Sequence, residues 1–158
     1  MREDIQKSCG SLQVCAGLES GCEAAIHAVR ETFEDDETEA ALLIDASNAF
    51  NSVKRECTLQ NIAVLCPSFY IFLIYTYRRP IRLLIPAWKL EIQSLEGTTQ
   101  GDPAAMGMYA LSVIPLIQAS RGLTKEGPFA KVWYADDGTG LGKLQIAELG
   151  PKYGYYAS

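Results

Sequence analysis

The sequence contains few of the residues that build the commonest metal and disulfide sites. It has a single histidine, His27, and five cysteines, an odd number without paired CxxC spacing. A disulfide framework needs cysteines in pairs, and a structural zinc site needs four closely placed Cys or His ligands. We therefore expect reduced thiols in an intracellular protein, and a packing or surface position for His27.

The sequence also lacks long apolar runs and linker-like segments. Its longest apolar run, residues 69–77, is far shorter than the roughly 20 residues that cross a bilayer. No leading segment has the basic start, apolar stretch and small-residue cleavage site of a signal peptide, and no Pro/Gly-rich stretch divides the chain. With 158 residues, 48% of them hydrophobic, the chain is expected to form a single domain over residues 1–158, with no membrane partner.

Positive charge is scarce for a protein that binds nucleic acid. The formal net charge is -5, whereas proteins that neutralise phosphates usually present a basic surface. The carboxylates gather in residues 31–39, which we expect to form a solvated helix end and loop. A small basic group stands elsewhere, at Arg78, Arg79, Arg82 and Lys89. Composition thus argues mildly against nucleic-acid binding. The basic group is nevertheless compatible with a local basic face on the protein.

The order of apolar and turn-forming residues predicts an α+β fold. Residues 40–44 form a short continuous apolar run, typical of a strand covered on both faces, and Asp45 ends it. The other expected elements are a helix from a capping box at 20–23, helices over 54–65 and 68–77, a hairpin with arms 82–85 and 89–93, a helix over 104–120 interrupted late by Pro115, and a strand over 129–134 followed by a tight turn at 136–138. This order is typical of an antiparallel sheet with helices packed on one face.

Three carboxylates stand next to the predicted strands. Asp45 lies at a strand end, and Asp136 and Asp137 lie at a hairpin tip. If both strands pair within one sheet, Asp45 and Asp136 converge at its edge, where like charges repel unless a divalent cation neutralises them. A Mg²⁺ ion held by few carboxylates and by substrate phosphates fits that arrangement. Alternatively, Asp137-Gly138 is a favoured hairpin-turn pair and needs no catalytic explanation.

Three short segments surround these carboxylates. They are Asp45-Ala46-Ser47-Asn48-Ala49-Phe50-Asn51, then Gly97-Thr98-Thr99-Gln100-Gly101-Asp102-Pro103, then Tyr134-Ala135-Asp136-Asp137. In this order they resemble three successive signature motifs of reverse transcriptases, most closely those of non-viral retroelements, and the resemblance covers residues 40–156. It implies a polymerase palm over residues 40–158, partial fingers over residues 1–39 and no thumb.

The resemblance also implies a reaction and its site. In the family, the positions matching Asp45, Asp136 and Asp137 are the catalytic carboxylates, which hold two Mg²⁺ or Mn²⁺ ions. The implied activity is RNA-directed DNA synthesis, in which deoxynucleoside triphosphates are added to a primer 3′-hydroxyl on an RNA or DNA template. The positions around the incoming nucleotide would be Ala46, Phe50, Gln100, Gly101 and Tyr134.

Several residues have a structural interpretation beside the functional one. Phe50 matches the bulky ring that excludes a ribose 2′-hydroxyl in the family, but by itself it is typical of a core aromatic. Arg78, Arg79 and Arg82 suit nucleic-acid phosphates, yet an exposed arginine group at a helix end equally favours the helix dipole. Trp88 and Trp133 are expected to pack rather than to stack on bases.

The second segment contains both backbone and side-chain signals. Gly97 and Gly101 would let the backbone approach a substrate without a Cβ in the way. Gln100 resembles the family's glutamine near the nucleotide and template. Asp102 is a good helix N-cap and Pro103 a good first helical residue, so capping explains Asp102 fully.

The chain departs from the family in ways that support a second hypothesis. Residues 138–149 are too few for both a returning strand and the helix that follows it in the family, and Ser158 comes before the expected pyrophosphate-protonating lysine. The alternative is a catalytically inactive retroelement relic that keeps the palm fold. Ala135 and Phe50 argue against a viral RNA-dependent RNA polymerase. An ordinary α+β domain whose acidic turn binds no metal is the remaining alternative.

Overall fold

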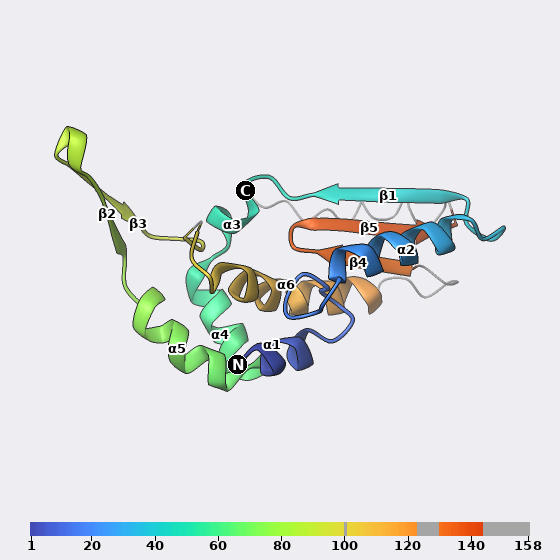
Figure 1. Ribbon diagram of the computed structural model, residues 1–158, viewed down its shortest axis with the longest axis horizontal. Coiled ribbons are helices and arrows are strands. Elements are labelled where there is room, and N and C mark those ends of the chain that lie inside the picture. The colour runs from blue at the N-terminus through green and yellow to red at the C-terminus, as the bar shows by residue number, and fades with distance from the viewer. Residues whose placement is uncertain (100, 123–129, 144–158) are drawn as a thin grey trace.

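The computed structural model describes residues 1–99, 101–122 and 130–143, in which helices and strands are mixed (Figure 1). The helices are α1 (Arg2–Cys9), α2 (Gly21–Phe33), α3 (Ala49–Ser52), α4 (Arg55–Leu65), α5 (Pro67–Tyr77) and α6 (Ala105–Gly122), with a 3-10 turn η1 (Pro86–Trp88). The strands are β1 (Ala40–Asp45), β2 (Ile81–Ile85), β3 (Leu90–Ser94), β4 (Ala130–Tyr134) and β5 (Asp137–Gly142). The predicted α+β class is confirmed.

A three-stranded antiparallel sheet carries β1, β5 and β4 in that order. β5 is central, and its register with β1 runs from Ala40 opposite Gly142 to Asp45 opposite Asp137. Within the described residues β1 has no second neighbour, and Leu43 is 77% exposed. The prediction that β1 is covered on both faces is therefore wrong. An unbroken apolar run reports only hydrophobicity, whereas the neighbours of a strand are decided by tertiary packing.

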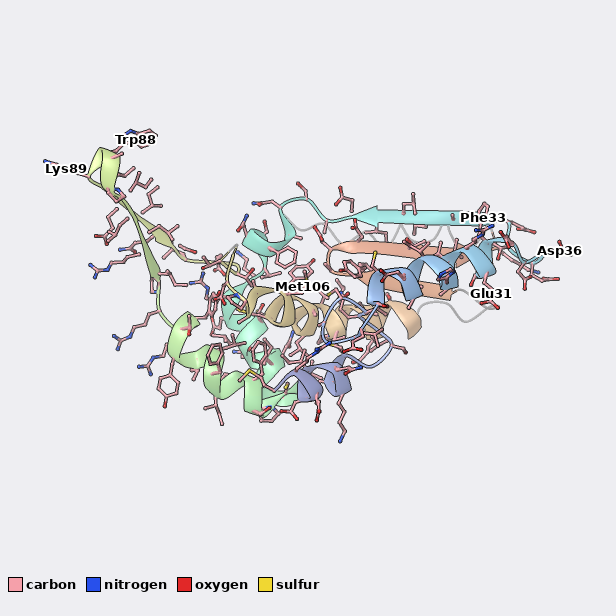
Figure 2. The ribbon with its side chains drawn as sticks, in the orientation of Figure 1. Glu31, Phe33, Asp36, Trp88, Lys89 and Met106 are labelled. Atoms are coloured by element: carbon pink, nitrogen blue, oxygen red, sulfur yellow. The ribbon has the colours of Figure 1, made fainter. Side chains whose placement is uncertain are left out.

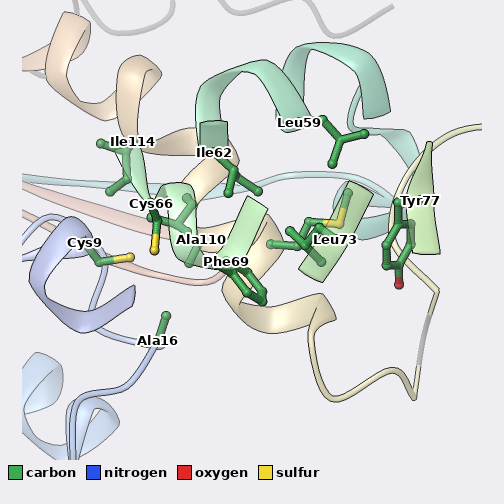
Figure 3. Packing of buried hydrophobic residues seen from close by; sticks show 12 residues of the cluster. Cys9, Ala16, Leu59, Ile62, Cys66, Phe69, Leu73, Tyr77, Ala110 and Ile114 are labelled. Atoms are coloured by element: carbon green, nitrogen blue, oxygen red, sulfur yellow. The ribbon is translucent and has the colours of Figure 1, made fainter. Parts of the chain in front are cut away.

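The hydrophobic core lies among four helices, α1, α4, α5 and α6, which we call the helical body (Figure 3). α4 packs against α5 and α6, and α1 contacts both of these helices. Ile62, Leu73 and Leu111 are fully buried between them. α2 instead packs against β4 and β5 of the sheet. Most of the fully buried apolar side chains therefore belong to the helical body.

The predicted helix boundaries are close to the observed ones, with two exceptions. α4 and α5 begin and end within one residue of the predicted ranges 54–65 and 68–77. α6 continues through Pro115 to Gly122, so the proline does not end the helix although it removes one backbone hydrogen bond. The capping box is wrong, because Ser20 has a left-handed backbone (φ 53°) and its side chain makes no capping hydrogen bond.

β2 and β3 form a separate hairpin that projects from the rest of the chain (Figure 1), close to the predicted arms. Its opposed residues Leu83 and Ile92 lie on one face and are 42% and 45% exposed. Trp88 and Lys89 stand at its outer end (Figure 2), and Trp88 is 77% exposed. The expectation that Trp88 packs against the protein is wrong.

The state of the cysteines and the position of the single histidine agree with the predictions from the sequence. All five cysteines are free, as expected. His27 is exposed on α2, which agrees with the predicted surface alternative. No helix in the described ranges is both long and apolar enough to cross a membrane.

Candidate functional site

The three predicted carboxylates lie where β1 ends and where β4 turns into β5. β1 ends at Asp45, β5 begins at Asp137, and these two residues are opposed across the strands, so Asp137 and not the predicted Asp136 is the carboxylate opposite Asp45. Directly opposed residues of an antiparallel pair share one face, with Cβ atoms roughly 5 Å apart. Tyr134, the last residue of β4, is opposed to Asp137 from the other side. Asp45, Asp137 and Tyr134 thus lie together on one face at one end of the sheet.

Asp136 lies in the two-residue turn between β4 and β5. That turn consists of Ala135 and Asp136, so the predicted turn position of Gly138 is wrong. Gly138 is opposed to Trp133, and a Cβ on Gly138 would lie 2.8 Å from the Trp133 ring. The close approach of this ring explains the glycine, and Trp133 packs within the protein as predicted. Turn chemistry therefore does not account for Asp137-Gly138.

The carboxylate pair suits an open cation site rather than a closed protein cage. Among the described residues, no three Cys, His, Asp or Glu side chains lie near enough to hold a metal ion by themselves. Asp45 and Asp137 are both exposed, and opposed like charges destabilise a strand pair. Mg²⁺ usually takes one or two protein carboxylates and completes its shell with waters and substrate phosphates. The oxygen donors present fit that kind of site.

The second segment lies directly against the first. The N–H of Gly97 donates to the carbonyl of Val53 at 2.9 Å, and the N–H of Thr98 donates to the carbonyl of Phe50 at 2.7 Å. Gly97 has a φ of 69°, and a Cβ there would lie 2.4 Å from the carbonyl oxygen of Asn51. The close approach that requires glycine at this position is thus to α3 of the same chain.

Arg55, to which the sequence assigned no role, fixes the loop that enters the second segment. It is 5% exposed, and its Nε donates to the carbonyl of Gly97 at 3.0 Å. Its Nη1 donates to the carbonyl of Ser94 at 3.0 Å, and its Nη2 donates to that of Glu96 at 2.9 Å. Burial lowers the pKa of Arg55 from its ordinary value. The planar guanidinium of Arg55 thus donates to three carbonyls at once and joins α4 to the base of the hairpin. The single ammonium group of a lysine does not have this arrangement of donors.

Tyr109 of α6 connects Phe50 with the surroundings of Asp136. The rings of Phe50 and Tyr109 are stacked, with centroids 4.4 Å apart and planes at 25°. Burial, followed by the negative charge of Asp136, raises the pKa of Tyr109 to about 12. Burial raises the pKa of the Cys15 thiol to about 11, with a smaller contribution from Asp136. Phe50 therefore has a packing partner, and Asp136 lies near Tyr109 and Cys15.

No protein-family model and no curated protein matches this chain. What the site does is therefore inferred from the geometry of the three segments and from the motifs that they carry.

Gln13, which the sequence also left without a role, holds the turn that carries Asp136. It is 1% exposed, and its Nε2 donates to the carbonyl of Ala135 at 2.9 Å. The N–H of Ala135 in turn donates to the Gln13 Oε1 at 2.7 Å. The N–H of Val14 donates to the carbonyl of Trp133 at 2.9 Å. The partners are 122 residues apart, so no local pattern in the sequence marks this contact.

The remaining predicted substrate positions have different surroundings. Ala46 follows β1 and is half-buried. Gly101 has a φ of 88°, and the space where a Cβ would stand is open. Gln100 lies outside the described residues.

Asp102 makes the local contacts expected of a capping residue. Its Oδ1 accepts a hydrogen bond from the N–H of Ala104 at 2.8 Å, and its Oδ2 accepts one from the hydroxyl of Tyr77. α6 begins at Ala105, so the capped turn precedes the helix by a residue or two. These bonds use both oxygens of Asp102 for structure.

Arg78 and Arg79 are exposed at the end of α5. The Arg78 guanidinium lies 6.0 Å from the centroid of the Tyr75 ring. Further along, Arg82 Nε lies 3.8 Å from Glu91 Oε1 on an exposed face of the hairpin. These positions suit both phosphate binding and the helix dipole, and so leave the two interpretations of Arg78 and Arg79 open.

Proposed function

We propose that this chain carries the palm of a reverse transcriptase, an RNA-directed DNA polymerase that works by two-metal nucleotidyl transfer. The proposal depends above all on one observation, the register that opposes Asp45 to Asp137 with Asp136 in the adjoining turn. Two carboxylates 92 positions apart are thereby brought to one end of the sheet. A strand pair gains nothing from opposed like charges unless a cation is shared between them.

Within this proposal, each carboxylate has a defined task. Asp45 and Asp137 face the same side and offer oxygen ligands, and Asp136 offers a further one from the turn. Bound Mg²⁺ or Mn²⁺ ions would supply Lewis acidity to the primer hydroxyl and charge neutralisation to the phosphates. The exposure of Asp45 and Asp137 leaves their oxygens accessible to a triphosphate.

Residues beside the carboxylates would select and place the nucleotide. The stack of Phe50 on Tyr109 favours one orientation of the Phe50 ring, and the ring would exclude a ribose 2′-hydroxyl. Gly101 leaves its backbone open to a substrate, and Ala46 follows Asp45 directly. Tyr134 shares the face of Asp137, and Gln100 belongs to the same proposed pocket by its motif. Arg78 and Arg79 are the proposed contacts to template or primer phosphates.

Mn²⁺ titration tests the proposed site without requiring DNA synthesis. The experiment compares the parent with Asp45→Asn and Asp136→Asn, and free Mn²⁺ is followed by electron paramagnetic resonance. Each substitution is expected to weaken Mn²⁺ binding about tenfold or more, since it removes one anionic oxygen ligand. Asp36→Asn is the matched control, because Asp36 is an exposed carboxylate on the acidic stretch away from the site. Equal Mn²⁺ binding by all four proteins would rule out a shared carboxylate site.

Primer extension on an RNA template is the second measurement. The parent is expected to incorporate deoxynucleotides, and Asp45→Asn is expected to abolish that activity. Phe50→Ala is expected to admit ribonucleotides, because it removes the ring that blocks the 2′-hydroxyl.

A catalytically inactive retroelement relic that keeps the palm fold is the second candidate. It is favoured by the lack, among the described residues, of three metal-ligating side chains that are already close together. This candidate predicts no primer extension by the parent and no difference in Mn²⁺ binding between the parent and Asp45→Asn or Asp136→Asn. Extension that is restored when longer flanking coding sequence is included would instead support the enzyme.

A further inference from the structure

The turn that carries Asp136 contains a residue in an unfavourable backbone conformation. Ala135 has a φ of 55°, in the left-handed region that non-glycine residues seldom occupy. Such a conformation costs free energy and persists only where its surroundings hold it. Ala135 is also 5% exposed, so its peptide N–H and carbonyl have little access to water.

The side chain of Gln13 provides hydrogen-bond partners for the buried N–H and carbonyl of Ala135. Its amide presents one acceptor and one donor, and these match the N–H and the carbonyl of Ala135 at 2.7 and 2.9 Å. Both polar ends of the Gln13 amide are therefore occupied, and the side chain is 1% exposed. Because it is buried, the Gln13 side chain is out of reach of a substrate.

The backbone after Gln13 runs beside β4. Val14 donates its N–H to the carbonyl of Trp133, so the segment lies beside the end of β4. Cys15, the next residue, lies within the field of the Asp136 charge. The N-terminal segment thus lies against the turn that carries Asp136, although its sequence carries none of the three motifs.

We infer that Gln13 is a positioning residue of the carboxylate site, because by holding both peptide groups of Ala135 it sets the direction in which Asp136 leaves the turn. This inference rests on the proposed function only in the claim that Asp136 holds a divalent cation. Residues that orient a metal ligand through hydrogen bonds typically change metal affinity by about 10- to 100-fold when they are replaced. The held carbonyl of Ala135 belongs to the peptide bond that joins Ala135 to Asp136, so a loss at the lower end of that range is expected here.

The test uses Gln13→Met, which fills nearly the same volume but makes neither hydrogen bond. Its matched control is Asn61→Leu, which removes a side-chain amide that donates to the carbonyl of Ser112 at 3.2 Å between α4 and α6. Gln13→Asn keeps the amide but is one methylene shorter, and it replaces Gln13→Met if that protein does not fold. All variants are prepared as the full chain.

Two quantities are measured on each protein. Residue-resolved amide hydrogen exchange at Ala135 reports whether the turn is held, independently of any metal. Mn²⁺ affinity reports whether the direction of Asp136 matters. We expect Gln13→Met to speed exchange at Ala135 and to weaken Mn²⁺ binding about tenfold, whereas Asn61→Leu changes neither quantity.

Each other outcome has a distinct meaning. Unchanged exchange at Ala135 in a folded Gln13 variant overturns the inference whatever the metal does. Faster exchange with parental Mn²⁺ affinity shows that Gln13 holds the turn but does not position a ligand, and this also overturns it. A parent that binds no Mn²⁺ overturns the proposed function, while the exchange data still decide whether Gln13 holds the turn.

Discussion

The helical body and the strand-built parts of this chain differ in how much apolar surface they bury. Leu73, Leu111 and Ile114 of the helical body are 0% exposed. In the sheet, by contrast, Leu43 is 77% exposed, and in the projecting hairpin Leu84 is 69% exposed. Because apolar burial is the dominant stabilising contribution to folding, stability is concentrated in the helices. The candidate carboxylates lie on the less buried part.

Buried polar contacts join these two regions. Arg55 of α4 holds the loop at the base of the hairpin, and Gln13 holds the turn between β4 and β5. Local opening of the hairpin or of the turn therefore needs the loss of a few hydrogen bonds, not the loss of the core. An isolated two-stranded hairpin is only marginally stable in water. The contacts that Arg55 makes at the base of the β2–β3 hairpin therefore determine whether the hairpin stays folded.

The largest expected contrast comes from the same substitution made in both regions. Leu73→Ala removes a fully buried side chain from the helical body and should lower the free energy of unfolding by about 2–5 kcal/mol. Leu43→Ala, on the exposed face of β1, should change it by no more than about 0.5 kcal/mol. Urea unfolding of the two variants gives the comparison. Similar losses would mean that the sheet is buried in solution and that the contrast between the regions is wrong.

Breaking the Arg55 contacts should have a smaller effect on stability and a local effect on structure. Arg55→Met leaves the carbonyls of Ser94, Glu96 and Gly97 without their donor and should cost about 2–3 kcal/mol. Amide exchange should quicken in β2 and β3 more than in α4. Arg55→Lys is the control for charge, since a lysine keeps the cation but not the fork. Full protection of the hairpin in Arg55→Met would show that other contacts order it.

Raising the pH from 9 to 10 should weaken the helical body through Cys9 by roughly 1 kcal/mol, the smallest of the three effects. Burial raises the pKa of Cys9 from 9.0 to about 12, so the folded state holds this proton more tightly than the unfolded state does. The resulting stabilisation is complete below pH 9 and is lost as the pH rises towards 12. Cys9→Ala should flatten this pH dependence in urea unfolding, and the exposed Cys57→Ala should not. Identical profiles for both variants would contradict the assignment.

Much of the local structure could be predicted because its signals are local. Pro67 and the break before it delimit α4 and α5, and Pro86 to Trp88 between two apolar arms predicts the hairpin. The strand ending at Asp45 was likewise found from its apolar run. Two of the errors, the two-face burial of β1 and the packing of Trp88, depend on neighbours that are distant in the chain. The turn position of Gly138 and the capping box at Ser20 are local errors, because Gly138 is opposed to Trp133 of the same hairpin and Ser20 has a left-handed backbone.

Some residues of the candidate site could likewise be predicted from the sequence, and others could not. Its carboxylates and the glycine-rich segment could be named from motifs, whereas Gln13, Arg55 and Tyr109 could not. Glutamine, arginine and tyrosine occur in many contexts, and a hydrogen-bonded partner 122 residues away leaves no periodic trace in the sequence. Their roles became visible only with the distances between their atoms.

By itself, the sequence determined the α+β class, the positions of most helices and strands, and the placement of Asp45, Asp136 and Asp137 at strand ends. These features follow from side-chain polarity and backbone preference over short stretches of chain. Only the tertiary structure decided that Asp45 is opposed to Asp137, that β1 stands at an edge of the sheet formed by the described strands, and that a buried glutamine holds the turn of Asp136. Register, burial and buried hydrogen bonds join residues far apart in the chain, and they are fixed only when the whole chain packs.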